Sequence, residues 1–485
     1  MGYIMNDLIM AITIAHKVDA LGGQTYFVGG YVRDKILDRT NKDIDIEVHG
    51  ITSEQLCNIL SGLGTVKTQG VSFGVYNLKG YDIDIAQPRM EKATGRGHKD
   101  FEVFVDPFIG TEKAAKRRDF TMNALMENVL TGEIIDHFGG ISDLQNGIIR
   151  HVDDVTFKED PLRVLRAAQF AARFGFDIAT ETKDIMRSMD LSTLSKERVY
   201  GEMEKALLKS DKPSIFFKSL RDVNQLDHWF PETKALIGCS QNANYHSEGD
   251  VWEHTMHVID SAATIKTDTT NPEFFMVSAL CHDFGKPVSM TVDDKGIVHS
   301  YGHEEAGVPV AEGFVRRLNN DVKLREYVTD MVCNHMKPHM CFNNQSSLKS
   351  SNRMFDVCKH PDDLIRLVKA DSEGKDFVSS NIEYGFLSER LHAYKMRMKE
   401  PEVTGADLIA LGMKPGPMFS EVLEHTHKLH LSYVDKDKAL KDTKTNFEKY
   451  KRKQLSKQKS VRNERLDGLL SDGQLPDVKG DKSYE

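Results

Sequence analysis

The chain has 485 residues, more than one ordinary hydrophobic core accommodates, so several domains are expected. Hydrophobic residues make up 40% and charged residues 28%, the balance of a globular protein, while 35 glycines and 14 prolines exclude collagen-like and proline-rich chains. No run approaches the roughly 18 consecutive apolar residues of a transmembrane helix, so no membrane association is expected.

The charge balance and the cysteines bear on partners and compartment. The 64 basic and 73 acidic residues give a net charge of -9, which by itself argues mildly against nucleic acid, because phosphate binding needs a basic surface. A basic run over 449–465 nevertheless allows local contact with RNA. The six cysteines are scattered without a CxxC pair, and no basic residue leads the first apolar run. We therefore expect free thiols, no secretion signal and a cytoplasmic location.

The first part of the chain alternates helix-like and strand-like segments. Apolar spacing predicts helices over 8–21, 31–37 and 53–63, and β-prone runs predict strands over 24–28, 43–48, 75–78 and 81–86. Residues 1–148 are therefore predicted to form a head domain with a mixed sheet.

Strand signals stop near residue 150. We predict a helical neck over 149–235, a histidine-rich helical domain over 236–400, and a helical tail over 401–485 with a basic, partly disordered end. The predicted fold class is α+β, with a mixed-sheet head followed by all-helical neck, histidine-rich and tail regions.

The head contains a candidate phosphate and metal site. Gly29 and Gly30 lie between a predicted strand and a helix, where glycines let backbone N–H groups approach a polyphosphate, and Arg33 follows one turn later. Asp43 and Asp45 are two residues apart on the next strand and share a face. Two adjacent carboxylates repel each other unless a cation such as Mg²⁺ lies between them. The alternatives are an ordinary tight turn and a solvated strand face.

A second pair of acids repeats this spacing. Asp82 and Asp84 lie on the later strand over 81–86. Asp84 is a candidate third carboxylate of the same site, and a solvated or hydrogen-bonded strand acid is the competing interpretation.

The predicted neck begins with an acid and two arginines at helical spacing. Asp160, Arg163 and Arg166 are each three residues apart, which would place them along one side of a helix. A carboxylate beside a guanidinium offers acceptors and donors in one plane, which suits the polar edge of a base. A surface ladder of ion pairs would use the same residues.

Taken together, these motifs resemble the class II tRNA nucleotidyltransferases (CCA-adding enzymes) and related bacterial poly(A) polymerases of the polymerase-β-like superfamily. The resemblance covers roughly residues 24–215, over Gly29–Asp34, Asp43–Asp45, Ser72–Gly74, Asp84–Glu91, Arg117–Leu125, Asp136–Leu144, Glu159–Ala167 and Glu197–Lys205. Several motifs in one order make the resemblance specific. One departure is Gln169, where some members carry a third arginine.

The resemblance implies roles for these residues. Asp43 and Asp45 would be the catalytic ligands of Mg²⁺. The triphosphate would be held by the backbone at the glycine turn, by Arg33 and by Arg118. Asp160 and Arg163, with Arg166 beside them, would pair with C or A in place of a nucleic-acid template. The implied substrates are CTP, ATP and the 3′ end of tRNA.

A second metal centre is predicted in the histidine-rich region. His254, the pair His282-Asp283 and Asp371 occur in an order that resembles the HD phosphohydrolase superfamily. By that resemblance these four are ligands of a divalent transition metal or Mg²⁺, with Asp371 the least securely placed, and two more histidines, His303 and His335, are candidate ligands of a binuclear centre. Single histidines that pack or cap helices are the alternative.

We therefore expect a CCA tRNA nucleotidyltransferase with an HD-type 2′,3′-cyclic phosphodiesterase or phosphatase activity. A poly(A) polymerase, or an enzyme that adds only CC or only A, would use the same chemistry. A different class of protein, an HD phosphohydrolase with a nucleotide-binding head, is also consistent with the motifs, and the sequence leaves the oligomeric state open.

Overall fold

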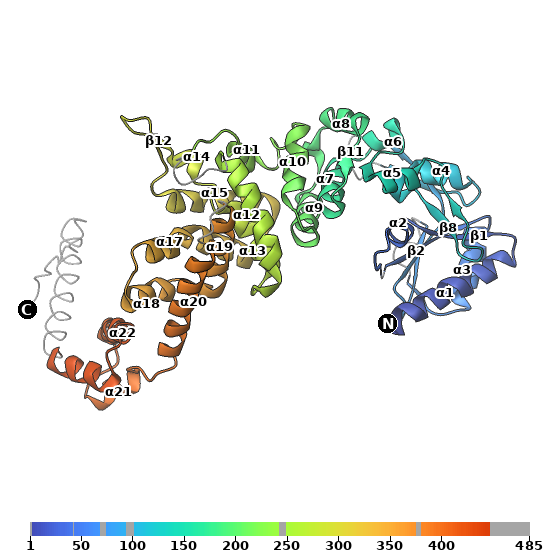
Figure 1. The fold of residues 1–485 in the computed structure, drawn as a ribbon. Helices are drawn as coiled ribbons and strands as arrows, with labels where there is room; N and C mark the ends of the chain where they lie inside the picture. Colours follow the sequence, from blue (N-terminus) through green and yellow to red (C-terminus); the bar gives the residue numbers. More distant parts are fainter. Residues whose placement is uncertain are drawn as a thin grey trace, which may run out of the picture. The chain divides into compact units, whose positions relative to one another are not determined.

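A computed structural model describes residues 2–41, 43–67, 74–93, 101–241, 249–374 and 380–446 (Figure 1). The chain divides into two compact units. The first comprises Met1–His335 with Arg366–Ser380, and the second comprises Met336–Ile365 with Asn381–Glu485. The predicted basic run over 449–465 lies outside the described residues, and the four predicted domain boundaries stay predictions.

A seven-stranded sheet forms the framework of the head, in the order β3-β4-β5-β2-β1-β8-β9. β2 and β5 are parallel and the other neighbours are antiparallel, so the prediction of a mixed sheet is confirmed. The strands are β1 (Gln24–Val28), β2 (Ile44–His49), β3 (Val66–Lys67), β4 (Val75–Leu78), β5 (Ile83–Ala86), β8 (Met126–Asn128) and β9 (Ile134–Ile135). A separate antiparallel pair is formed by β6 (Arg89–Ala93) and β7 (Phe101–Val105).

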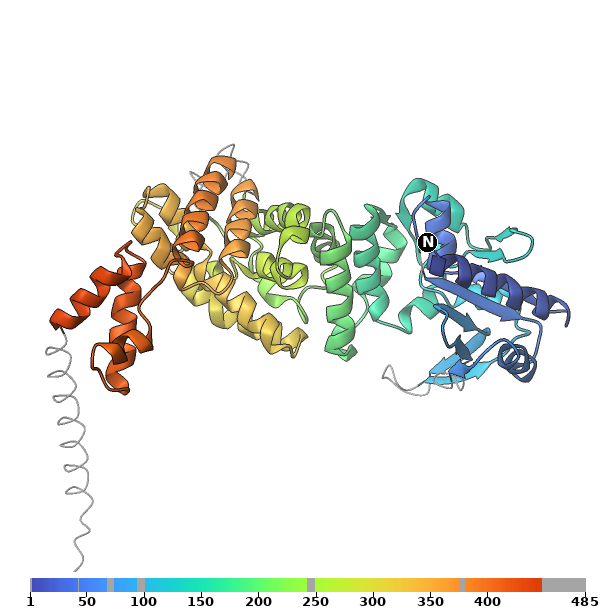
Figure 2. The same cartoon turned by 90° about the horizontal axis from the view of Figure 1, so that it is seen from below.

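Alternation along β2 explains how the head buries one face of its sheet. Ile44, Ile46 and Val48 are buried in the core, and Asp45 between them faces the other side. Helix α1 (Gly2–Asp19) packs on β1, β2 and α3 (Ser53–Ser61), as Figure 2 shows. The remaining head helices are α2 (Gly30–Ile36), α4 (Thr111–Lys116), η2 (Thr121–Asn123) and α5 (Gly140–Asn146).

The first unit continues in helices. They are α6 (Asp154–Lys158), α7 (Leu162–Phe174), α8 (Thr180–Arg187), η3 (Leu191–Thr193), α9 (Lys196–Lys209), α10 (Ser214–Asp222), α11 (Pro231–Ala235), α12 (Val251–Ile265), η4 (Lys266–Asp268), α13 (Pro272–Cys281), α14 (Lys286–Ser289), α15 (His303–Leu318), α16 (Val322–Asn334) and α19 (Pro361–Gly374, of which residues 361–365 belong to the second unit). None of the helices in the described ranges is both long and apolar enough to cross a membrane.

The regions after the head are helical, as predicted, and they also contain two short pairs of strands. β10 (Ile148–Ile149) pairs with β11 (Asp177–Ile178) in parallel, and β12 (Thr291–Val292) forms a hairpin with β13 (Val298–His299). Each of these strands has only two residues, too few for an alternating pattern to appear in the sequence.

The second unit has its own hydrophobic core. Its helices are α17 (Met336–Asn343), α18 (Leu348–Asp356), α20 (Ser380–Arg397, whose first residue belongs to the first unit), α21 (Gly405–Ala410) and α22 (Pro417–His430). Leu408 and Val422 are fully buried in a cluster with Val403 and Ala439. Arg397 is buried beside them, and it donates to the carbonyl oxygens of residues 430 and 434 at 2.7 and 2.8 Å.

Candidate active sites

Two of the three predicted head carboxylates lie on neighbouring strands, and the third directly precedes one of these strands. Asp43 precedes β2 directly and Asp45 lies within it, so the two are separated by the two-residue period of a strand. Asp45 is the direct partner of Asp84 across the parallel pair β2 and β5, which places both side chains on the same side of the sheet. Sequence spacing suggested each acid pair, and the strand pairing joins them into one group.

The charges in this group are unfavourable without a cation. Burial and then the nearby carboxylates of Asp84 and Asp43 together raise the pKa of Asp45 to about 6, although Arg118 acts in the opposite direction. Asp84 also accepts a hydrogen bond from the amide of Asn77. A half-buried carboxylate between two others is the donor set that Mg²⁺ prefers, so these residues fit that ion.

The glycine turn lies beside the acids. Gly29 connects β1 to α2 with a φ of 65°, a conformation that other residues adopt rarely. A Cβ at Gly29 would lie 3.2 Å from Nη1 of Arg118 and 3.8 Å from Oδ2 of Asp45. The turn, one guanidinium and one carboxylate therefore converge, and a larger residue at position 29 would occupy the space between them.

Arg33 differs from the expectation of a phosphate ligand. Its guanidinium is only 4% exposed, donates to Asp34 and Asn123 at 2.7 Å each, and packs against the ring of Phe174. Because its donors already have partners in the protein, the geometry favours a structural role in fastening α2 to η2 and α7.

Glu47, the next acid on the same face of β2, was not among the predicted site residues. Its carboxylate is 1% exposed and lies 2.9 Å from Nε2 of His49, 3.4 Å from Arg118 and 3.7 Å from Arg117. Burial raises its pKa, but the hydrogen bond from His49 and the two guanidinium groups outweigh burial and lower it to about 2. Glu47 thus anchors Arg118 beside the site. Extending the alternation of Asp43 and Asp45 by two residues would have found it.

The predicted geometry of the selecting residues is corrected in one respect. Helix α7 begins at Leu162, so Asp160 lies before it, accepting from the backbone N–H of Leu162 and pairing with Arg198 at 2.8 Å. Arg163 donates to the carbonyl oxygens of residues 156 and 117, at 2.9 and 2.7 Å. Asp160 and Arg163 therefore have separate partners. The helix does not extend back to Asp160, because Pro161 occupies its N-cap position.

The third residue of this motif belongs to another network. Arg166 donates to the buried Asp119 at 2.7 Å. Burial raises the pKa of that carboxyl, but Arg166 and Asn123 outweigh burial and lower it. Gln169, the departure from the family pattern, is buried on α7.

The second site gathers all six predicted residues. In the part of the chain that the structure describes, two groups of three residues offer ligand atoms within 4.8 Å of one another: His254, His282 and Asp371, and Asp283, His303 and His335. All six are buried. They come from α12, the segment after α13, α15, the end of α16 and α19.

Asp283 connects the two groups. Its Oδ2 lies 3.2 Å from Nε2 of His282 and 3.5 Å from Nε2 of His254. Its Oδ1 lies 3.3 Å from Nε2 of His303 and 3.8 Å from Nε2 of His335. One oxygen therefore faces each group, so Asp283 lies within reach of both sets of ligand atoms.

Backbone contacts orient three of the imidazoles. Nδ1 of His282, His303 and His335 lies 2.8, 2.8 and 2.7 Å from the carbonyl oxygens of residues 279, 300 and 332. Each Nδ1 therefore carries the hydrogen, and each Nε2 presents a lone pair to the centre. Nε2 of His303 and of His335 are only 3.1 Å apart, and two lone pairs at that distance repel. These donors fit divalent metal ions.

The segment that follows the His-Asp pair is also built around the centre. Lys286 is buried, with Nζ 2.7 Å from Oδ2 of Asp283 and 3.0 Å from Oε1 of Gln241. Burial raises the pKa of Asp283, but Lys286 and His282 outweigh burial and hold it well below its usual range. A Cβ at Gly285 would lie 2.0 Å from the carbonyl oxygen of His303, so only glycine lets the two segments approach.

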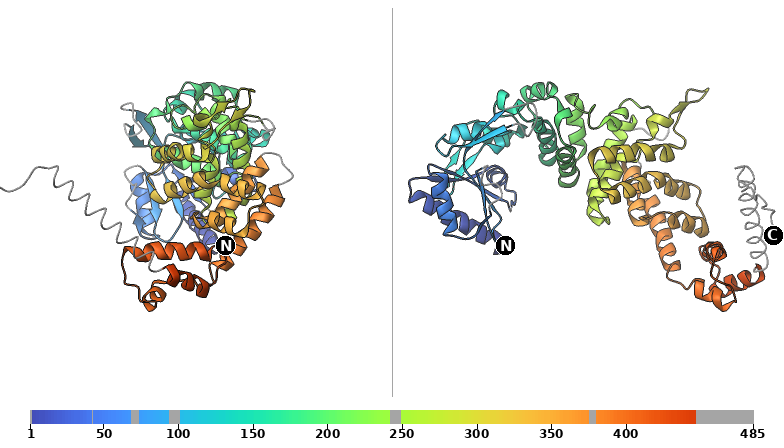
Figure 3. Two further views of the ribbon diagram at one scale, coloured as in Figure 1. Left: turned by 90° about the vertical axis from the view of Figure 1, so that its left-hand side faces the viewer. Right: turned by 180° about the vertical axis from the view of Figure 1, so that it is seen from behind.

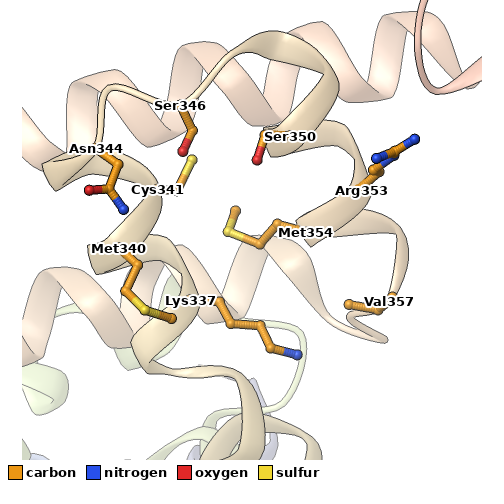
Figure 4. Close-up of a pocket in the computed structure, with 9 residues that line it drawn as sticks. All are labelled: Lys337, Met340, Cys341, Asn344, Ser346, Ser350, Arg353, Met354 and Val357. Atoms are coloured by element: carbon orange, nitrogen blue, oxygen red, sulfur yellow. The ribbon is translucent and has the colours of Figure 1, made fainter.

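The second unit contains a hollow of about 390 Å³ between α17 and α18. Figure 4 shows Cys341 and Met354 pointing into it, while the guanidinium of Arg353 points outward. Lys337 and Arg353 give it a basic rim. None of the residues predicted for the two active sites lines it.

Models of known protein families match three stretches of the chain. The family model described as "Poly A polymerase head domain" matches residues 25–150, "Probable RNA and SrmB- binding site of polymerase A" matches 175–237, and "HD domain" matches 251–356. The structure of Thermotoga maritima CCA-adding enzyme complexed with tRNA has a TM-score of 0.61 at 20% identity, over 90% of this chain and 95% of that one. An apo form of a CCA-adding enzyme gives 0.64 at 20% identity, over 90% and 95%. These likenesses establish the fold, with its polymerase-β-like head.

The head, with its acids on adjacent strands, and the HD centre place the protein in the class of nucleotidyltransferases joined to an HD domain. A multifunctional CCA protein of Pasteurella multocida is 34% identical over 403 residues, which is 80% of this chain and 92% of that protein. Another, from Nitrosococcus oceani, is 34% identical over 410 residues, or 83% and 96%. The chain belongs to the family of multifunctional CCA proteins.

Proposed function

We propose that this enzyme adds C, C and A to the 3′ end of tRNA, using CTP and ATP. The observation that carries this proposal is the convergence of Asp45, Asp84 and Arg118 beside the turn at Gly29. Carboxylates on one side and a guanidinium on the other suit a triphosphate that brings a divalent cation with it. The related proteins are multifunctional CCA proteins, and solved structures of similar fold include complexes with tRNA, ATP and CTP.

In this proposal Asp43 and Asp45, with Asp84 as a third ligand, hold Mg²⁺. The ion, when bound, activates the attacking 3′-hydroxyl and offsets charge on the departing pyrophosphate. Arg118, fixed by Glu47, orients the triphosphate across the glycine turn. This positioning keeps the α-phosphorus in line with the attacking hydroxyl. In phosphoryl transfer, much of the rate enhancement comes from such positioning.

Asp160 and Arg163 are proposed to select the base. In the structure their polar atoms bond to Arg198 and to backbone carbonyl oxygens, respectively. A base edge would have to replace these contacts, so binding of CTP or ATP would release Arg198 from Asp160. Arg166 keeps its hydrogen bond to Asp119 and thereby holds α7 in position.

The test is extension of tRNA lacking its 3′ end with CTP and ATP, with and without Mg²⁺, followed by sequencing of the product. We expect C, C and A in order, and loss of incorporation in Asp43→Ala and Asp45→Ala. Asp82→Asn, an exposed acid nearby on the chain, is the matched control and should extend normally. A long A tract would instead identify a poly(A) polymerase, and a product ending after CC or a single A would identify a partial enzyme.

We also propose that the HD centre hydrolyses phosphoesters, including a 2′,3′-cyclic phosphate at a damaged RNA end. Its support is the pair of ligand groups joined by Asp283. The metals, when bound, would activate water for attack on phosphorus. Lys286 is placed to offset negative charge next to Asp283.

The HD activity is tested with 2′,3′-cyclic AMP and the double variant His282→Ala/Asp283→Ala, after metal analysis of the purified protein. We expect this variant to lose hydrolysis while tRNA extension persists, and Asp45→Ala to show the reverse. Loss of tRNA extension in the HD variant, with hydrolysis untouched by Asp45→Ala, would favour a protein whose main chemistry is hydrolytic.

The six cysteines are free thiols, in keeping with the proposed cytoplasmic location.

A further inference from the structure

A stacked pair of rings lies just before His303, one of the predicted ligands of the HD centre, in the chain. Tyr301 is 80% exposed, and its ring lies on that of His299 with centroids 5.0 Å apart and planes 12° from parallel. Both residues lie where the hairpin of β12 and β13 leads into α15, and the hairpin projects from the helices around it (Figures 1 and 3). Neither ring was assigned a role above.

The pair is held in position by the hairpin. Nε2 of His299 lies 3.1 Å from Oδ2 of Asp293, and Oδ1 of the same carboxylate accepts from the backbone N–H groups of Lys295 and Ile297 at 2.9 and 2.8 Å. Asp293 thus closes the turn and fixes the imidazole on which the phenol ring rests. The aromatic surface is organised before any ligand arrives.

The chain ties this surface closely to the metal ligands. Tyr301 precedes His303 by two residues, so their Cα atoms are at most about 7 Å apart. Nδ1 of His303 contacts the carbonyl oxygen of Ser300, on the other side of Tyr301. The exposed ring is therefore carried on the segment that leads directly into a predicted metal ligand.

We propose that Tyr301, supported by His299, is the platform on which the base of the terminal nucleotide stacks while its phosphate lies at the HD centre. This rests on the proposed phosphohydrolase function and adds the substrate class, a nucleoside-bearing phosphoester. Stacking accepts any base, because every base has a π-face. A platform of this kind suits RNA ends of variable sequence.

The test compares two substrates on the full-length, metal-loaded protein. One is 2′,3′-cyclic AMP, and the other is β-glycerophosphate, a phosphoester without a ring. Tyr301→Ala should raise KM for 2′,3′-cyclic AMP by about 5- to 150-fold and leave kcat, and both constants for β-glycerophosphate, unchanged. Tyr301→Phe should behave as wild type because it keeps the ring. His299→Ala should raise KM by a smaller factor.

Val292→Ala is the matched control, since Val292 is a 60% exposed residue of the same hairpin outside the stack. Equal KM changes for both substrates in Tyr301→Ala, or no change for either, would overturn the platform. A wild-type protein that cleaves neither substrate would overturn the phosphohydrolase proposal, and the platform with it. That outcome is distinct from cleavage that is insensitive to Tyr301.

Discussion

Replacing Asp45 by Asn should abolish nucleotide addition and yet stabilise the metal-free protein. The pKa of Asp45 is raised from 3.8 to about 6, first by burial and then by Asp84 and Asp43. At 1.36 kcal/mol for each pKa unit, keeping this carboxylate ionised costs about 3 kcal/mol, an upper bound because residual solvent exposure screens part of the repulsion. The neutral amide of Asn removes that cost.

The sign of the pH dependence follows from the raised pKa. Above pH 6 the wild type carries the full penalty, below about pH 3.8 it carries none, and at pH 5 roughly half remains. Asp45→Asn should therefore exceed the wild type in stability most at pH 8 and less at pH 5. Mg²⁺ should stabilise the wild type and have little effect on the variant, because one ligand is missing.

The assay is calorimetric unfolding of the full chain in EDTA at pH 8 and pH 5, repeated with Mg²⁺. Asp82→Asn, which removes an exposed acid from the same part of the head, controls for net charge. If Asp45→Asn were no more stable than Asp82→Asn in EDTA at pH 8, neither burial nor the neighbouring carboxylates would be penalising the charge of Asp45, and the reasoning about the metal site would fail.

Three further outcomes are expected. Glu47→Gln should lose about 3–5 kcal/mol in urea unfolding, since it leaves the charge of Arg118 near the site without its buried partner, and should raise KM for CTP. Chelation of metal from the HD centre should lower the unfolding temperature of the protein, because the ligand atoms repel one another when no cation lies between them. Adding Mn²⁺ should restore the unfolding temperature. Although partial burial lowers the pKa of His427, Glu402 and Asp356 on either side outweigh burial and raise it. His427→Gln should therefore destabilise the protein at pH 6 and have little effect at pH 9, as measured by thermal unfolding at both values.

Local patterns were enough to predict some site residues and insufficient for others. Asp43 and Asp45 share a face because a strand has a period of two, and that property needs no tertiary information. The contribution of Asp84 depends on the pairing of β5 with β2. The 38 residues between Asp45 and Asp84 carry no signal that these two strands are partners. Arg33 was expected at a phosphate because its position in the turn suggested it, whereas Phe174 and Asn123, far along the chain, bury it.

The residues alone determined which chemistry this protein carries: carboxylates at strand spacing beside a glycine turn, and histidines with aspartates of the HD type. Tertiary structure decided which of those groups act together, because a pKa, a buried ion pair or a bridging carboxylate depends on distances of 3–4 Å between atoms brought together by packing. Glu47 illustrates the difference, since it is an ordinary acid in the sequence and becomes the buried partner of Arg118 only in the fold.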